Sequence, residues 1–182
     1  MRELSLHILD IAQNSISAKA EVLRIAIIEK LDKDRMIIKI KDDGEGMEKH
    51  DLENVVDPFF TSRTTRKVGL GIPMFKAAAE QCNGKFTINS HLGIGTEVEA
   101  EFQHSNIDRV PLGNMSDTIV AIILSNPNMQ LIYTHSVNDE KFTLNTKEIV
   151  KILGEVPISN IDVINWLREY LREGLKEINI AD

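Results

Sequence analysis

Two polar side chains near the start of the chain, Asp10 and Asn14, are spaced to act together. Residues 4–18 carry apolar side chains at helical spacing, which places Asp10 and Asn14 one turn apart on the opposite, polar face. An asparagine carbonyl offers Mg²⁺ a hard oxygen ligand. A carboxylate one turn earlier can accept a proton from a water molecule, or orient that water. The pair therefore predicts a magnesium ligand at Asn14 and a general base at Asp10, although solvated helix faces often show the same spacing.

A second group of residues follows a strand predicted over residues 35–41. Asp42 stands at the strand end, where its carboxylate can accept a hydrogen bond from the exocyclic amine of adenine. Gly44 and Gly46 would let the backbone approach the base closely, and Met47 could pack against the ring. The alternative interpretation is an acidic turn that only joins two elements.

A third group surrounds the start of a helix predicted over residues 70–82. Gly69 and Gly71 flank this start, where unpaired amides and the helix dipole favour phosphate. The preceding residues 59–68 lack periodicity and are expected to form a mobile loop, and its basic side chains could neutralise phosphate charge. The chain has no P-loop, no dinucleotide fingerprint and no kinase-fold signature.

Periodicity predicts an order of helix, two strands, loop, helix and two strands up to about residue 102, followed by a structured extension. Pro73 fits only the first turn of its helix. The expected helices are 4–18, 51–56, 70–82, 146–153 and 161–178, and the expected strands are 22–29, 35–41, 85–90, 97–102, 118–124 and 130–137.

Composition narrows the class of protein. No apolar run approaches the roughly 20 residues that cross a bilayer, and the first residues do not resemble a secretory signal, so we expect a soluble cytoplasmic protein without a membrane partner. Cys82 is the only cysteine, which excludes an internal disulfide. A net charge of −7 argues against nucleic acid as a partner.

Taken together, the motifs resemble the nucleotide-binding boxes of the GHKL superfamily, which includes gyrase, the heat-shock chaperone ATPase, sensor histidine kinases and the mismatch-repair ATPase. The resemblance covers about residues 4–102. It is similar to histidine kinases at 57–60 (Asp-Pro-Phe-Phe), at 68–72 (Val-Gly-Leu-Gly-Ile) and at Gly95-Thr96, whereas residues 10–15 are closer to the ATPase and anti-sigma-kinase versions.

This resemblance implies an α/β two-layer sandwich of helices over a mixed sheet, the Bergerat-type ATP-binding fold. It divides the chain into an ATP-binding domain, 1–104, and a C-terminal extension of strands and two helices, 105–182, as a candidate docking element for a partner. The implied cofactors are ATP and Mg²⁺, with Asp10 catalytic, Asn14 on the metal and residues 61–68 as a lid. The implied ATP-binding residues are Asn14, Asp42, Gly44, Gly46, Met47, Thr61, Arg66, Lys67, Gly69, Leu70, Gly71 and Thr96.

Three activities fit this resemblance. The chain could phosphorylate a partner protein, hydrolyse ATP slowly with lid closure and a homodimer as output, or bind ATP as a switch without turnover. A non-catalytic α+β interaction domain is a further alternative. Only 13 residues precede Asn14, so we expect the phosphoacceptor hairpin of histidine kinases to be lacking. Asp10 stands where most members with a catalytic acid have Glu, Lys67 replaces a glycine, and Ser17 replaces a charged residue, which puts the catalytic rate in doubt more than binding.

Overall fold

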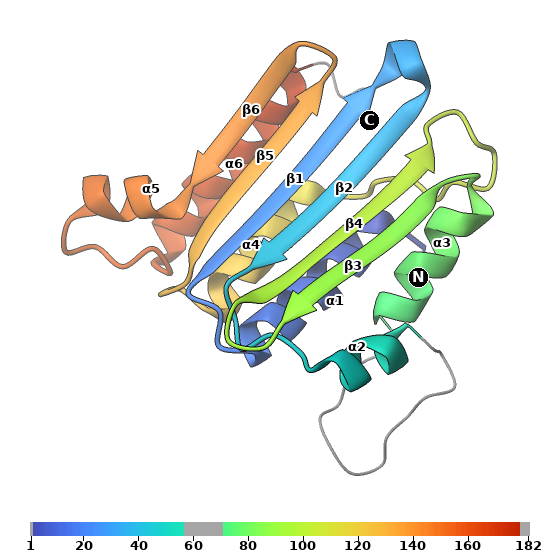
Figure 1. Cartoon of the computed structure of the whole chain (residues 1–182). Helices are drawn as coiled ribbons and strands as arrows, with labels where there is room; N and C mark the ends of the chain where they lie inside the picture. The colour runs from blue at the N-terminus through green and yellow to red at the C-terminus, as the bar shows by residue number, and fades with distance from the viewer. Residues whose placement is uncertain (1, 57–70, 179–182) are drawn as a thin grey trace.

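A computed structural model describes residues 2–56 and 71–178 of the chain. One mixed sheet of six strands runs through them in the order β3-β4-β2-β1-β5-β6, and helices cover one of its faces (Figure 1). The strands are β1 (Val22–Lys30), β2 (Arg35–Asp42), β3 (Lys85–His91), β4 (Gly95–Gln103), β5 (Gln130–Val137) and β6 (Glu140–Asn145). The helices are α1 (Leu4–Ser17), α2 (Lys49–Val55), α3 (Gly71–Gln81), α4 (Met115–Ser125), α5 (Thr146–Leu153) and α6 (Ile161–Glu177), with a 3₁₀ turn η1 (Leu31–Lys33).

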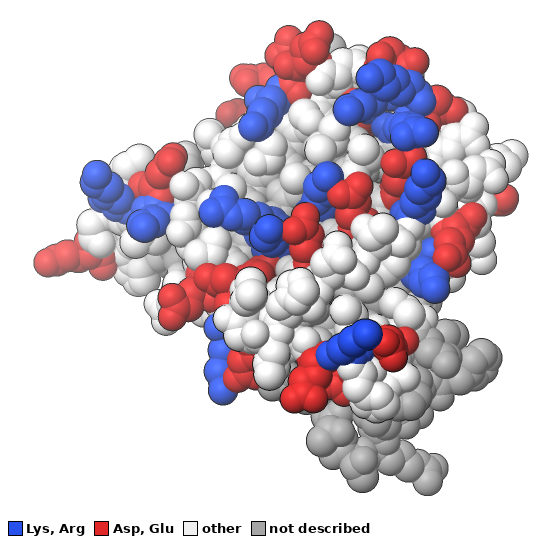
Figure 2. Space-filling view, in the orientation of Figure 1, with Lys and Arg blue, Asp and Glu red and all other residues white. Residues whose placement is uncertain are grey.

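Buried and more exposed residues alternate along the strands, as the sequence predicts. In β1 and β2, buried residues point to the helical layer and the residues between them point outward. On the outward face, β2 and β4 are joined by three ion pairs, Arg35–Glu101, Lys39–Glu99 and Lys41–Glu97. Figure 2 shows positive and negative side chains intermingled over the open face of the sheet.

Helix α1 lies against the centre of the sheet and contacts both α3 and α4. Its apolar stripe is completely buried, with Leu4, Ile8 and Ala12 at 0% exposure. The first amides of a helix have no acceptor within the helix. In α1, the amides of Leu4 and Ser5 donate instead to the carbonyls of Pro111 and Leu112, at 3.0 and 2.8 Å. The connection between β4 and α4 therefore fixes the beginning of the helix that carries Asp10 and Asn14. No helix in the two described ranges is both long and apolar enough to cross a membrane.

The predicted two-layer α/β fold is confirmed, but two elements differ from the prediction. Residues 118–124, expected as a strand, belong to helix α4, because the side chain of Asn114 caps the helix by accepting from the amide of Asp117 at 3.0 Å. A continuous apolar run fits a buried helix as well as a strand, and α4 packs between α1 and α6. Strand β6 was not expected, because it is short and follows β5 through a tight turn with Asn138 at positive φ.

The extension joins the sheet of the N-terminal part. Strand β5 pairs in parallel with β1 over eight residue pairs, from Val22–Gln130 to Glu29–Val137. A parallel neighbour requires a crossover, and α4 supplies it on the helical face. Strands β1 and β2, which precede the site, are therefore interior strands of the sheet.

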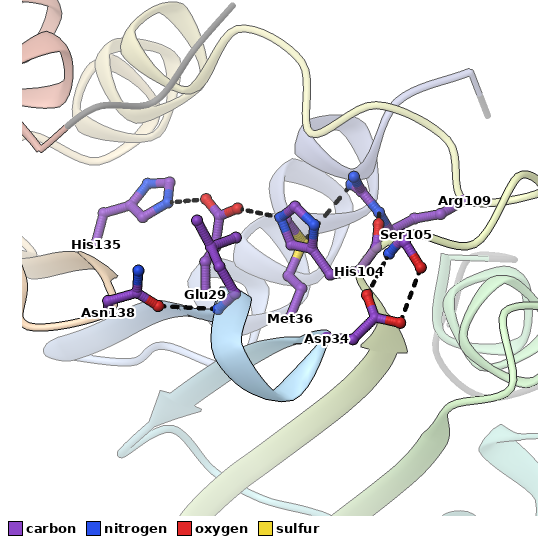
Figure 3. Close-up of polar contacts among 9 residues, drawn as sticks. Glu29, Asp34, Met36, His104, Ser105, Arg109, His135 and Asn138 are labelled. Carbon is purple, nitrogen blue, oxygen red and sulfur yellow. Dashed lines mark hydrogen bonds and ion pairs between the residues drawn. The ribbon is translucent and has the colours of Figure 1, made fainter.

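A buried polar network closes the sheet at the end opposite Asp42. Glu29 accepts from Nε2 of His104 and from Nε2 of His135, both at 2.7 Å (Figure 3). Tyr133 Oη lies 2.9 Å from Nδ1 of His135. Burial opposes ionisation of Glu29, but the hydrogen bonds from the two histidines outweigh it and lower the pKa of its carboxyl. Burial raises the pKa of Tyr133, so the phenol stays protonated as a donor. The network ties β1, β5 and the residue after β4 together.

Replacing Glu29 with Gln is predicted to destabilise the fold by about 2–4 kcal/mol, because an amide group would face a buried histidine N–H. Chemical unfolding measures this loss. Since folding lowers the pKa of Glu29, its contribution is present above its ordinary value of 4.5 and is lost as the pH falls through the lower folded value. The control is Glu99→Gln on the open face, which should cost less than about 1 kcal/mol. Equal losses for the two variants would contradict a special role of the network.

Candidate functional site

The carboxylate of Asp42 is held from three sides. Its Oδ1 accepts from the amides of Gly44 at 2.9 Å and Thr96 at 3.3 Å, and its Oδ2 accepts from the hydroxyl of Ser15 at 2.6 Å. An ionised carboxylate has about four acceptor positions, so one remains for a further donor. The loop after β2, helix α1 and the start of β4 thus fix one carboxylate, and its unused acceptor position can serve a ligand.

A cavity of about 350 Å³ opens beside this carboxylate. Its volume falls in the range of about 300–1,000 Å³ that is usual for small-molecule sites. Its wall is mostly apolar, with Asp42, Asn14 and a few hydroxyls as the polar groups. The lining residues are Ile11, Asn14, Ser15, Ser17, Ala18, Asp42, Gly46, Met47, Val55, Ile72, Thr96 and Val98. The combination suits a flat, mostly apolar ring with a hydrogen-bond donor at its edge.

The loop after β2 fits closely under the turn between β3 and β4. Gly46 has φ +66, and a Cβ at this position would collide with the carbonyl of His91, so this turn requires glycine. Met47 then donates its amide to Oγ of Ser90 at 2.9 Å, and the Ser90 hydroxyl lies 2.9 Å from that of Thr96. These bonds hold Met47 and Thr96 at the cavity wall.

Asn14 lines the cavity, and its side-chain amide is incompletely bonded. Its Nδ2 is buried and has no hydrogen-bond partner among the residues that the structure describes. A buried polar atom without a partner costs about 1–3 kcal/mol, so a ligand that bonds this amide would remove a penalty that the protein alone carries.

Asp10 and Gly71 meet beside the cavity without lining it. A Cβ added at Gly71 would lie 3.0 Å from Cγ of Asp10 and closer still to its Oδ2. Gly71 is the first residue of α3 that the structure describes, so the carboxylate of Asp10 lies directly against the N-terminal end of the described helix. First-turn amides lack an intrahelical partner, so a carboxylate and a potential phosphate-binding helix start share one location.

The structure places the predicted residues in three groups. Asn14, Asp42, Gly46, Met47 and Thr96 line one cavity, Gly44 supports Asp42 from outside it, and Asp10 and Gly71 touch each other nearby. The remaining predicted residues, Thr61, Arg66, Lys67, Gly69 and Leu70, lie outside the described residues, as does the predicted lid at 61–68.

Several contributors were missed from the sequence. Ser15 holds Asp42, Ser90 holds Met47, and Ile11, Ile72 and Val98 form apolar walls. The position of Ser15 carried a usable signal, because it directly follows Asn14 and falls among the buried residues of an amphipathic helix. The apolar walls carried none, since core positions and cavity walls use the same residue types.

The family follows from a comparison with known sequences. Residues 2–106 match the model of the histidine kinase-, DNA gyrase B- and HSP90-like ATPase family. This match covers more than half of the 182 residues, and the chain therefore belongs to this family. The predicted GHKL membership is confirmed.

Curated relatives are similar over the same part of the chain. Sporulation kinase D of Bacillus subtilis is 35% identical over 92 residues, which is 50% of this chain and 18% of the relative. The sensor histidine kinase YxdK of the same organism is 32% identical over 75 residues, 39% of this chain and 23% of the relative. The chain thus spans less than a quarter of the length of these relatives.

Solved structures share the fold over most of the chain. The MutL ATPase domain of Aquifex aeolicus, solved with ADP, has a TM-score of 0.56 at 15% identity and covers 93% of this chain and 88% of its own. The N-terminal domain of a DNA repair protein has a TM-score of 0.52 at 13% identity, with 80% and 53% covered. At these identities, the likeness concerns the fold.

The contact between Gly71 and Asp10 predicts a specific cost for Gly71→Ala. The added methyl would force α3 away from α1, and we expect a loss of about 1–3 kcal/mol in the free energy of unfolding. A double-mutant cycle with Asp10→Ala provides the control, because removal of the carboxylate makes room for the methyl. The same loss in both backgrounds would show that Gly71 does not contact Asp10.

Proposed function

We propose that this protein binds ATP with Mg²⁺ in the cavity beside Asp42 and uses the bound nucleotide to phosphorylate or regulate a partner protein. The observation that carries the proposal is the convergence of an anchored carboxylate, an unpaired amide and an apolar wall on one cavity in a member of an ATPase family. The adenine amine would donate to Asp42, and its ring would lie against the apolar wall.

The residues on the cavity fit a magnesium nucleotide. Mg²⁺ usually retains waters and substrate phosphate oxygens with one or two protein ligands, and the Asn14 side chain carries an oxygen of the required kind. The ion would neutralise triphosphate charge. Asp10 of α1, which lies against Gly71 of α3, would orient or deprotonate the attacking hydroxyl or water.

Two outputs remain as candidates. In the first, Asp10 activates a side-chain hydroxyl or imidazole of a partner, and the γ-phosphate is transferred. In the second, the protein hydrolyses ATP slowly or only binds it, and the nucleotide alters how residues 105–182 meet a partner or a second copy of the chain. The similarity to kinases over the nucleotide-binding part favours the first. The charge of −7 accords with the absence of nucleic acid as a partner, and this absence and a cytoplasmic location both stay predictions.

Asp42→Asn is predicted to weaken ATP binding at least tenfold, about 1.4 kcal/mol, because the new amide replaces an acceptor by a donor. Calorimetric titration of ATP with and without Mg²⁺ measures the loss, and the circular dichroism spectrum checks the fold. The control is Asp51→Asn on the exposed face of α2, which should bind as the wild type does. Unchanged affinity in Asp42→Asn would reject the adenine assignment.

Asp10→Asn separates binding from catalysis. We expect at least about a hundredfold lower phosphate release or transfer, the usual scale for a lost general base, with ATP affinity within about threefold of the wild type. Incubation with γ-labelled ATP, alone and with a cell extract, follows both phosphate release and transfer to protein. Label on a partner supports the kinase output, whereas free phosphate alone supports the hydrolase. If the wild type binds ATP and does neither, the catalytic part of the proposal is wrong.

A further inference from the structure

His7 is a buried side chain that the proposed reaction leaves unused. It lies on α1 one turn before Asp10 and is only 2% exposed. Its imidazole stacks on the ring of Phe75 in α3, with a centroid distance of 5.3 Å and an angle of 23° between the planes. Its Nδ1 is buried without a hydrogen-bond partner among the described residues. Keeping such a group costs stability, which calls for a physical reason.

Helices α1 and α3 meet in two consecutive contacts. His7 contacts Phe75, and one turn further along α1, Asp10 contacts Gly71, one turn earlier on α3. The two helices thus run past each other in opposite directions. A shift of α3 that separates the two rings would also separate Gly71 from the carboxylate, because a helix moves as a rigid unit over one turn.

We propose that His7 is a positioning residue whose ring contact with Phe75 holds the start of α3 against the Asp10 carboxylate. This inference rests on the proposed role of Asp10, and it concerns a residue that does not touch the nucleotide cavity. The ring contact sets how close the phosphate-binding end of α3 comes to the group that activates the attacking nucleophile.

An uncharged ring suits this role. Burial, with a smaller effect from the positive amino terminus, lowers the pKa of His7 to about 4, while Asp10 and a hydrogen bond with the backbone of Gly71 act in the opposite direction. The connection after β4 and the end of α3 bring Asp108 and Cys82 to the small cavity, about 200 Å³, that His7 also lines. The imidazole is therefore neutral near pH 7 and does not form an ion pair with Asp10, which leaves that carboxylate available for the reacting group.

Three variants test the proposal. His7→Ala should lower the rate of phosphate release or transfer at saturating ATP at least tenfold while the ATP dissociation constant stays within threefold. His7→Phe keeps an aromatic ring and should restore the rate to within threefold of the wild type, with the same pH dependence between pH 6 and 8. If His7→Ala fails to fold, Phe75→Leu removes the ring stack from the other helix. Loss of rate in His7→Phe with a changed pH profile would make His7 an acid or base and overturn the positioning role.

A second readout does not require turnover. In an amide NMR spectrum, the Gly71 resonance should move further in His7→Ala than in His7→Phe, which keeps the ring contact but lacks the hydrogen bond with the Gly71 backbone. The resonances of Gly44 and Thr96, which lie beside the Asp42 carboxylate, should stay in place. An unmoved Gly71 signal, or an equal change at Gly44 and Thr96, would overturn the proposal. A wild type that neither releases nor transfers phosphate would instead count against the proposed function, and the Gly71 signal would still decide the role of His7.

Discussion

The burial of α1 between the sheet and two neighbouring helices is the constraint on which the site depends. One face of this helix contributes Leu4, Ile8 and Ala12 to the core, and its turn geometry then aims Asn14 and Ser15 at the end of β2. The hydroxyl of Ser15 can reach the carboxylate of Asp42 only if the C-terminal end of α1 lies next to the end of β2. The site is thus a consequence of core packing, and its precision comes from residues that never touch a ligand.

The two ends of the central strands β1 and β2 hold carboxylates in different surroundings. At one end of β1 and β2, the carboxylate of Asp42 has spare acceptor capacity beside a cavity. At the other end, the carboxylate of Glu29 is enclosed by two imidazoles and has a lowered pKa. The same side-chain chemistry keeps an acceptor position open in the first case and is used up by the fold in the second. What differs is whether neighbouring donors leave an acceptor position open.

Much of the fold and part of the site could be read from the sequence, for identifiable reasons. Residues 4–18 and the strands around Asp42 have clear periods, and glycines at 44 and 46 mark a turn whose geometry few other residues allow. Residues 118–124 could not be assigned by period, because an apolar run buried on all sides looks alike in a strand and in a helix. The contacts of Ser15 with Asp42 and of His7 with Phe75 join residues distant in the chain, so periodicity alone could not give these partners.

The parallel pairing of β1 with β5 has a consequence for how the protein can be divided. A fragment ending near residue 104 would leave the hydrogen-bonding edge of β1 open along eight residues. It would also uncover the side of α1 that α4 shields. An unpaired edge next to exposed apolar surface invites chains to associate with one another. The cavity beside Asp42 is therefore built on strands whose pairing the C-terminal extension completes, and α1, which lines that cavity, lies directly against α4 of the extension.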